Sequence, residues 1–206
     1  MDLLKNLKDD DNRRLFTAIK KLHAEADGLF REQFDRSLPL AEELSNRWQR
    51  ATDLGFGQGT SIYESALVYG RPEIGTDCWI GPFTIIDGSG GLKIGNNCTV
   101  SAGTQIYSHD NIAACLTAGK AEIKRSPTSI GNCVYIGPNV VVSRGVKIGN
   151  HCLIGAFTLV NRDVPDNAIV VGQPARVIGR VEIVGDEVKL HYDRQNSTGA
   201  GTGAEK

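Results

Sequence analysis

Long apolar runs and a strong net charge are both missing from this sequence. No stretch approaches the roughly 18 apolar residues of a membrane span, and the opening MDLLKNLKDDDNRRLF carries charges where a secretion signal needs an apolar core. The net charge of −1 lacks the basic excess that binds nucleic acid or an acidic membrane surface. We therefore expect a cytoplasmic protein with no membrane span and no nucleic-acid partner.

Cysteine pairs and nucleotide-binding loops are missing as well. The five cysteines are odd in number and form no CxxC pair: Cys78, Cys98, Cys115, Cys133 and Cys152. This usage is typical of reduced thiols in a cytosol, and it argues against a disulfide framework or a zinc site. No P-loop or GxGxxG motif is present, which disfavours nucleotide hydrolysis and nicotinamide chemistry.

Glycine, by contrast, is abundant, and its 24 copies are spaced rather than clustered. Isoleucine followed by glycine recurs, and an apolar residue returns every six positions. Grouped in threes, these positions are 56/62/68, 74/80/86, 94/100/106, 130/136/142 and 148/154/160. The register slips twice, by two residues within 88–93 and by eighteen between Ile106 and Ile130.

A residue that returns to the same corner in every turn stacks on its own copies and builds an apolar ladder inside a narrow prism. The fourth residue after each ladder position also points inward and has to be small: Cys78, Thr84, Cys98, Thr104, Val134, Val140, Val146, Cys152, Thr158 and Val164. Buried there, the cysteines act as small hydrophobes. The pattern predicts a mainly β fold, a parallel β-helix of about five coils over residues 56–180, with an excursion loop at 110–129.

The flanks lack this hexad. Apolar residues recur at helical spacing in two groups, Leu15, Ile19, Leu22, Ala26 and Phe30, then Leu40, Leu44 and Trp48. Residues 1–55 are therefore expected to form two amphipathic helices that cap or flank the prism. We expect closing strands at 181–192 and a disordered, polar and Gly-rich tail at 193–206.

Three passages carry a family resemblance. They are Ile86-Asp87-Gly88, the run Ile106-Tyr107-Ser108-His109-Asp110, and the ending Asn161-Arg162-Asp163-Val164-Pro165 with Gly172-Gln173-Pro174-Ala175-Arg176. Residues 56–180 resemble the hexapeptide-repeat acyltransferases, and most of all the maltose, galactoside and polysaccharide O-acetyltransferases. The resemblance implies a left-handed coil, a homotrimer with shared sites, and metal-free acetyl transfer from acetyl-CoA to a sugar or polysaccharide precursor.

His109 stands at the last coil position before the excursion, where loops on a rigid scaffold often carry chemistry. With the resemblance, this position makes His109 the expected catalytic base. An acceptor hydroxyl must lose its proton as it attacks the thioester, and neutral imidazole can take that proton at pH 7. The resemblance implies direct transfer, with the same histidine protonating the CoA thiolate. Cys115, as a nucleophile, is the alternative.

The group that orients His109 stays open between a backbone carbonyl, Asp110 and Glu122. The resemblance makes Asp87 a ligand of sugar hydroxyls, although a plain turn residue explains it equally well. Tyr135 occupies a position where relatives often place a tryptophan that lines the acceptor pocket, and it is expected to stack on a sugar ring.

On the coenzyme side, the resemblance places the pantetheine arm along the small residues Gly137, Gly155 and Ala156, which are also ordinary hexad corners. It places the phosphates on Arg162 and Arg176, with Arg144 and Arg180 as weaker candidates. Arginine suits phosphate because its planar guanidinium donates two parallel hydrogen bonds.

Three alternatives remain. The same fold serves N-acetyltransferases of amino-sugar nucleotides, which often carry an α/β domain in front, and residues 1–55 are too short for one. A non-catalytic structural β-helix needs no histidine at the excursion. A γ-type carbonic anhydrase needs three histidines on zinc, and only His109 and His151 lie in the coils. Finally, residues 81–84 read Gly-Pro-Phe-Thr where relatives often carry asparagine, so the acceptor need not be maltose or a galactoside.

Overall fold

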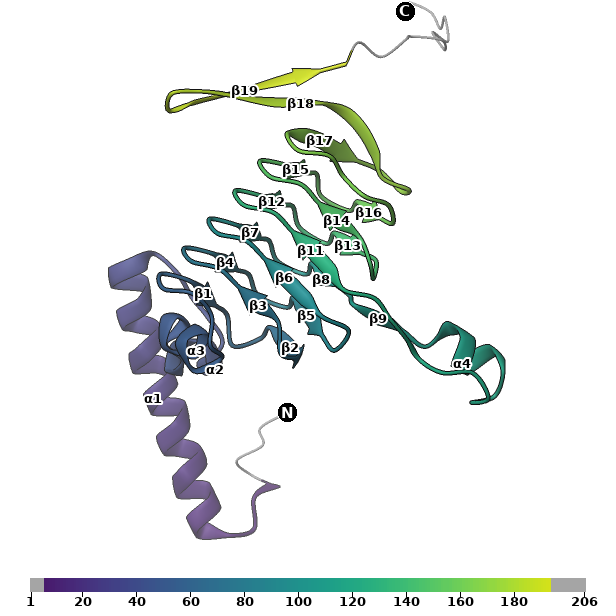
Figure 1. Ribbon diagram of the computed structural model, residues 1–206. Helices are drawn as coiled ribbons and strands as arrows, with labels where there is room; N and C mark the ends of the chain where they lie inside the picture. Colours follow the sequence, from purple (N-terminus) through teal and green to yellow (C-terminus); the bar gives the residue numbers. More distant parts are fainter. Residues whose placement is uncertain (1–5, 194–206) are drawn as a thin grey trace, which may run out of the picture.

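A computed structural model describes residues 6–193, so nearly all of the tail predicted at 193–206 lies outside the described residues. The coils stack as three parallel sheets (Figure 1). The first sheet holds β1 (Ser61–Ile62), β4 (Trp79–Ile80), β7 (Thr99–Val100), β12 (Tyr135–Ile136), β15 (Leu153–Ile154) and β17 (Ala168–Val171). The second holds β2 (Leu67–Gly70), β5 (Ile85–Gly88), β8 (Gln105–Ile106), β13 (Val141–Val142) and β16 (Leu159–Val160). The third holds β3 (Glu73–Ile74), β6 (Leu92–Ile94), β11 (Thr128–Ile130) and β14 (Lys147–Ile148).

This architecture confirms the predicted parallel β-helix. Ladder residues meet their copies one coil away, as Ile86 pairs in register with Ile106 and Ile106 with Val142. The inward column that includes Cys78, Cys98 and Cys152 is buried as predicted. The first sheet carries one parallel rung beyond the five predicted coils, since β17 pairs with β15 after the hexad has ended.

A ladder of stacked Asn and Asp side chains explains why glycines occupy the corner between the third and first sheets. The backbone N–H of Asn96 donates to Oδ1 of Asn132 (2.8 Å), that of Asn132 to Asn150 (2.9 Å), and that of Asn150 to Asp166 (2.6 Å). A Cβ on Gly95 would lie 2.5 Å from Oδ1 of Asn132. Glycine is required there because the ladder leaves no room for a side chain.

Within residues 6–55, three helices precede the coils rather than the two predicted: α1 (Asp10–Phe34), α2 (Leu40–Leu44) and α3 (Arg47–Asp53). The second predicted helix is split because Asn46 caps a new one, accepting hydrogen bonds from the backbone N–H of Trp48 and Gln49. The apolar stripes do not face a core, since α1 buries no residue and Trp48 is 54% exposed.

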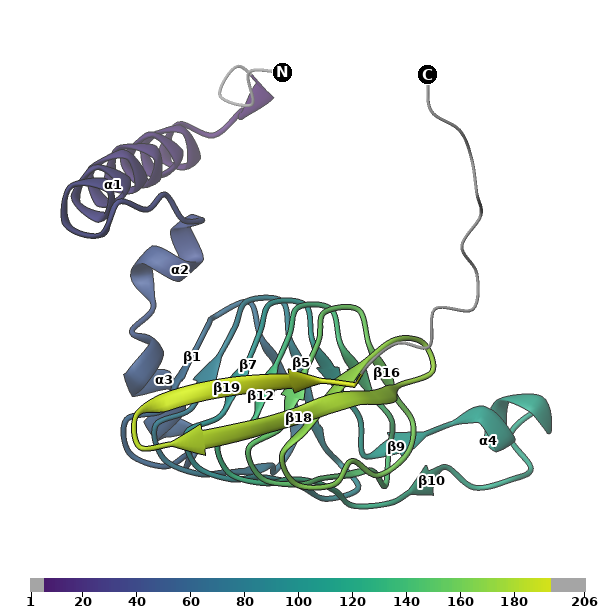
Figure 2. The ribbon, with the colours of Figure 1, turned by 90° about the horizontal axis from the view of Figure 1, so that it is seen from above.

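Polar contacts attach this segment to the first coils, together with Ala51 of α3, which is buried in the core. The buried Glu42 accepts hydrogen bonds from the backbone N–H of Glu64 and Ser65 (2.9 Å each) and from the Ser65 hydroxyl (2.6 Å). Arg50 donates to the carbonyls of Tyr63 and Ala66. In Figure 2, α3 lies beside the coils while α1 and α2 stand to one side.

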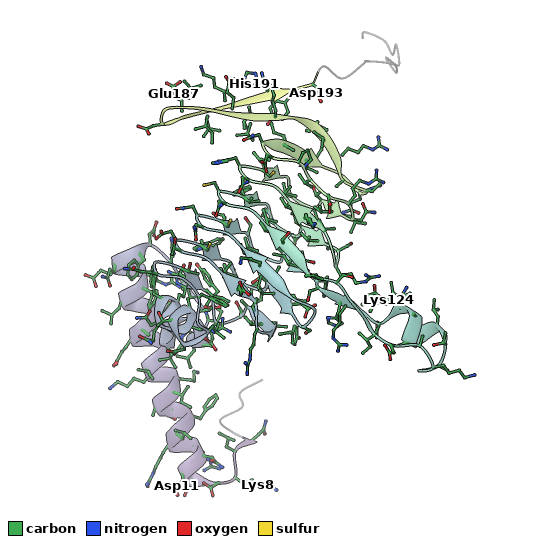
Figure 3. All side chains as sticks on the ribbon, in the orientation of Figure 1. Lys8, Asp11, Lys124, Glu187, His191 and Asp193 are labelled. Atoms are coloured by element: carbon green, nitrogen blue, oxygen red, sulfur yellow. The ribbon has the colours of Figure 1, made fainter. Side chains whose placement is uncertain are left out.

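At the other end, β18 (Arg176–Val184) and β19 (Glu187–Tyr192) form an antiparallel hairpin that continues the first sheet beyond β17. Figure 3 shows Glu187 and His191 on this hairpin, above the last coil. Among residues 6–193, no helix combines the length and the apolar character that a bilayer span requires.

The excursion is an arm, residues 109–125, that leaves the prism between β8 and β11. It consists of β9 (His109–Asp110), α4 (Ile112–Leu116) and β10 (Lys124–Arg125), with β9 and β10 paired antiparallel. Figures 1 and 2 show α4 well away from the coils, and Lys124 marks the returning strand in Figure 3. His109 is therefore the first residue of the arm and lies where it joins the prism.

Candidate active site

The candidate site lies at the corner between the second and third sheets. In the coil of β8 the chain does not turn directly into the third sheet but leaves as the arm, and His109 stands at this exit. The side chain of His109 is 35% exposed, so one edge of the ring is open to solvent while the other faces the coils.

Asp87 holds the inner edge of that ring. Nδ1 of His109 lies 2.6 Å from Oδ2 of Asp87, whose side chain has no exposed surface. A charged carboxylate only accepts hydrogen bonds, so Nδ1 carries the proton and donates it to Asp87. No hydrogen bond to any of residues 6–193 engages Nε2, which is left as the unprotonated, basic nitrogen.

The charge on Asp87 is stabilised by its neighbours. Burial alone would raise the pKa of this carboxyl, but hydrogen bonds from Ser89, Ser108 and His109 outweigh it and hold the pKa of Asp87 well below its usual range. The backbone N–H groups of Ser108 (2.8 Å) and Ser89 (3.0 Å) both donate to it. Asp87 is thus a fixed anion beneath the ring.

This placement differs from the expectation that Asp87 contacts sugar hydroxyls. Its oxygens are buried and already accept protein donors, so an acceptor molecule has no access to them in this chain. The hexad register already predicts that Asp87 lies near His109. Ile86 and Ile106 occupy the same ladder position one coil apart, so residues 87 and 109 lie at the same corner.

The two carboxylates considered as partners of His109 lie elsewhere. Asp110 forms an ion pair with Arg144 and accepts from the backbone N–H of Ile112 (3.1 Å). Glu122 is exposed on the arm. Arg144 also donates to the Ser126 hydroxyl (3.0 Å), so it ties both ends of the arm to the next coil instead of standing free for a phosphate.

The basic residues expected on the coenzyme side come together. Arg162 and Arg176 line one hollow of about 240 Å³ with Asp163 and Val164. Arg162 follows β16 at the same kind of corner as His109, further along the edge towards the hairpin. Both arginines are exposed.

The remaining predicted residues are not near His109 within one chain. Gly137, Gly155 and Ala156 form the corner between the first and second sheets, and a Cβ on Gly137 would lie 2.8 Å from the backbone nitrogen of Ala156. Tyr135, 45% exposed, lies on the first sheet beside Leu153 and the hairpin. A single chain therefore brings Asp87 and His109 together, but not the small corner or Tyr135.

Comparison with known families supports the repeat. The model described as bacterial transferase hexapeptide (six repeats) matches residues 127–162, and the model described as hexapeptide repeat of succinyl-transferase matches residues 73–108. The two matches lie on either side of the arm and cover the coils that carry Asp87, Ser108 and Arg162.

Individual proteins are similar over most of the coils. Galactoside O-acetyltransferase of Escherichia coli is 29% identical, over 58% of this chain and 67% of its own length. The hexapeptide-repeat containing acetyltransferase VCA0836 of Vibrio cholerae is 27% identical with a TM-score of 0.52, over 79% of this chain and 92% of that one. AntD of Bacillus cereus, an N-acyltransferase solved with dTDP and 3-hydroxybutyryl-CoA, shares the fold, at 20% identity and a TM-score of 0.55, over 66% of this chain and 90% of that one.

Proposed function

We propose that this chain, a member of the hexapeptide-repeat acyltransferases, transfers an acetyl group from acetyl-CoA. The acceptor is a hydroxyl of a sugar or polysaccharide precursor. The observation that carries the proposal is the His109–Asp87 pair, a half-open imidazole held through Nδ1 by a buried anion. The similarity to a galactoside O-acetyltransferase supports a sugar hydroxyl as the acceptor. AntD, solved with an acyl-CoA, supports the donor class.

His109 is the general base of a direct transfer. Nε2 takes the proton of the acceptor hydroxyl while its oxygen bonds to the thioester carbonyl carbon, and Asp87 stabilises the imidazolium that forms. The carbon–sulfur bond then breaks, and the CoA thiolate leaves with the proton from Nε2. The ring returns to its starting state, and no acyl group is attached to the protein.

The coenzyme contacts complete the proposal. Arg162 and Arg176 bind the phosphates of CoA in the hollow that they share, because two guanidinium groups offer paired donors to an anion. The small corner of Gly137, Gly155 and Ala156 receives the pantetheine arm. Because that corner is remote from His109 within a chain, each site combines two subunits, in the homotrimer that the family resemblance implies.

The test is acetyl-CoA consumption, followed as free thiol release, with a panel of sugars, sugar nucleotides and amino sugars. Wild type is compared with His109→Ala and with His151→Ala, a histidine of the coils at a different corner. We expect acceptor-dependent release that falls by at least about a hundredfold in His109→Ala and stays within about twofold in His151→Ala.

Three outcomes would contradict this function. Release that survives His109→Ala would exclude the histidine as base. Release with amino sugars alone would make the protein an N-acetyltransferase, and no release with no calorimetric binding of CoA would make it a non-catalytic β-helix.

A further inference from the structure

Ser108, next to His109, is fully buried and has every polar group engaged. Its backbone N–H (2.8 Å) and its hydroxyl (3.1 Å) both donate to Oδ2 of Asp87, the same oxygen that His109 contacts. Its carbonyl accepts from the backbone N–H of Ser126 (2.9 Å). This buried serine, two residues beyond a ladder position, therefore uses all of its polar groups in hydrogen bonds around Asp87 and the start of the arm.

The two-residue insertion in the preceding coil, within residues 88–93, supplies the donor that holds the Ser108 hydroxyl. The backbone N–H of Gly90 donates to the Ser108 hydroxyl oxygen (2.8 Å), which fixes the hydroxyl proton towards Asp87. A Cβ on Gly90 would lie 2.0 Å from the Ser108 carbonyl oxygen, so only glycine allows this approach. A chain of donors thus runs from Gly90 through Ser108 to Asp87.

We propose that Ser108 is a positioning residue for the transfer reaction, and that its hydroxyl, held by Gly90, fixes the Asp87 carboxylate that orients His109. This inference rests on the proposed function of His109. Ser108 has no exposed surface and touches no substrate, so it acts only through Asp87.

The hydroxyl does two things to the pair. It keeps Oδ2 of Asp87 in line with Nδ1 of His109, since three donors on one oxygen leave the carboxylate little freedom to rotate. It also shares the negative charge of Oδ2, so that less of this charge faces the ring. A carboxylate with one donor fewer attracts the imidazolium more strongly.

Substituting Ser108 replaces none of the charged and titratable groups around this site. They are Asp87 on β5, Tyr107 in the same coil, Asp110 and Arg125 on the arm, and Arg144 on the next coil. A shift in the titration of His109 on changing Ser108 is therefore assigned to the lost hydroxyl.

The first measurement compares kcat and KM between pH 5 and 9 for wild type, Ser108→Ala and Ser61→Ala. Ser61 is the matched control, a buried serine of the first coil on another sheet, away from His109 and from the small corner. For Ser108→Ala we expect kcat to fall by about tenfold to a hundredfold with KM within twofold, and the acidic limb of the profile to move to higher pH. Ser61→Ala should follow wild type.

A second measurement needs no substrate, so it separates this inference from the proposed function. Nitrogen-15 NMR of the His109 ring reports its tautomer and its titration midpoint in each variant. In wild type we expect the neutral ring protonated at Nδ1, and in Ser108→Ala a midpoint at higher pH, because the carboxylate then attracts the imidazolium more strongly. This result would support the role of Ser108 even if no acceptor were found.

A third variant tests whether filling the site is enough. The Ser108→Cys thiol is larger than the hydroxyl but donates only weakly, so we expect this variant to behave like Ser108→Ala. The proposal is overturned if Ser108→Cys behaves like wild type, if Ser108→Ala keeps the wild-type profile and midpoint, or if Ser61→Ala shows the same losses.

Discussion

Asp87 and His109 lie 22 residues apart in the chain, yet Oδ2 of the first and Nδ1 of the second are 2.6 Å apart. The coil brings them together, because Ile86 and Ile106 stack at the same ladder position and each is followed by the same corner. One member is fully buried and the other is 35% exposed. The pair thus has a buried, fixed carboxylate and a partly exposed imidazole. A general base requires both, because its ring must be held in place and still reach the acceptor.

Replacing the anchor should slow the chemical step and leave binding intact. In Asp87→Asn the amide can donate to Nδ1, which shifts the ring proton to Nε2 and removes the base. We expect kcat to fall by about a thousandfold with KM within threefold, measured as thiol release.

The matched control is Asp110→Asn. This carboxylate adjoins His109 in sequence but pairs with Arg144, so we expect a loss of less than about tenfold. Equal losses in the two variants would mean that local negative charge, and not the contact with Nδ1, matters.

The same carboxylate should make the fold sensitive to acid. The pKa of Asp87 is depressed in the folded chain, although burial opposes this, so its stabilising effect is complete above its unfolded pKa of about 4 and is lost as the pH falls towards the folded value. Urea unfolding of wild type and Asp87→Asn at pH 7, 4 and 3 checks this. The advantage of wild type should shrink below pH 4, and an advantage that grows on acidification would contradict it.

The ladders were predictable because each position repeats the same information. Ile62, Ile80 and Val100 occupy the same buried ladder position in three coils. A misassigned position in one coil would therefore not have changed the predicted register. Leu44 and Trp48 have no copies in neighbouring coils against which their positions could be checked. Their spacing predicted a helix, but the Asn46 cap split it and left both side chains exposed.

The orientation of Asp87 could not be derived from the hexad. It depends on Ser89 and Gly90 in the two-residue insertion, which occurs once in the chain and has no copy to compare with. The register placed His109 at the root of the arm, where the structure has it. The contacts of Asp87 differ from the role that the resemblance implied, and they could not be read from the sequence alone.

Arg144 should control the mobility of the arm. It joins Asp110 and Ser126, at the two ends of the arm, to the coil above. In Arg144→Ala we expect trypsin to cleave at Lys120 or Lys124 at least about fivefold faster, because opening of the arm costs less free energy. Arg162→Ala, on the same edge but without a contact to the arm, should show the wild-type rate. Unchanged cleavage in Arg144→Ala would mean that the arm is held by other contacts.

The arginine hollow should recognise the phosphates of CoA. Calorimetry with Arg162→Ala and Arg176→Ala should show CoA binding weakened by about tenfold each, the value of one charge-assisted contact. Dephospho-CoA, which lacks the 3′-phosphate, identifies the group bound. If an arginine contacts that phosphate, its loss should not weaken dephospho-CoA further. Wild-type CoA affinity in both variants would place the coenzyme elsewhere.

The most direct test of the account is a double-mutant cycle on thiol release with wild type, Asp87→Asn, His109→Ala and the double variant. If Asp87 acts only by holding His109, then Asp87→Asn slows the wild-type protein strongly but has no further effect once His109 is alanine. If Asp87→Asn instead slows both backgrounds by the same factor, Asp87 acts independently of the histidine, as a ligand of the acceptor would, and the pair is not the catalytic unit.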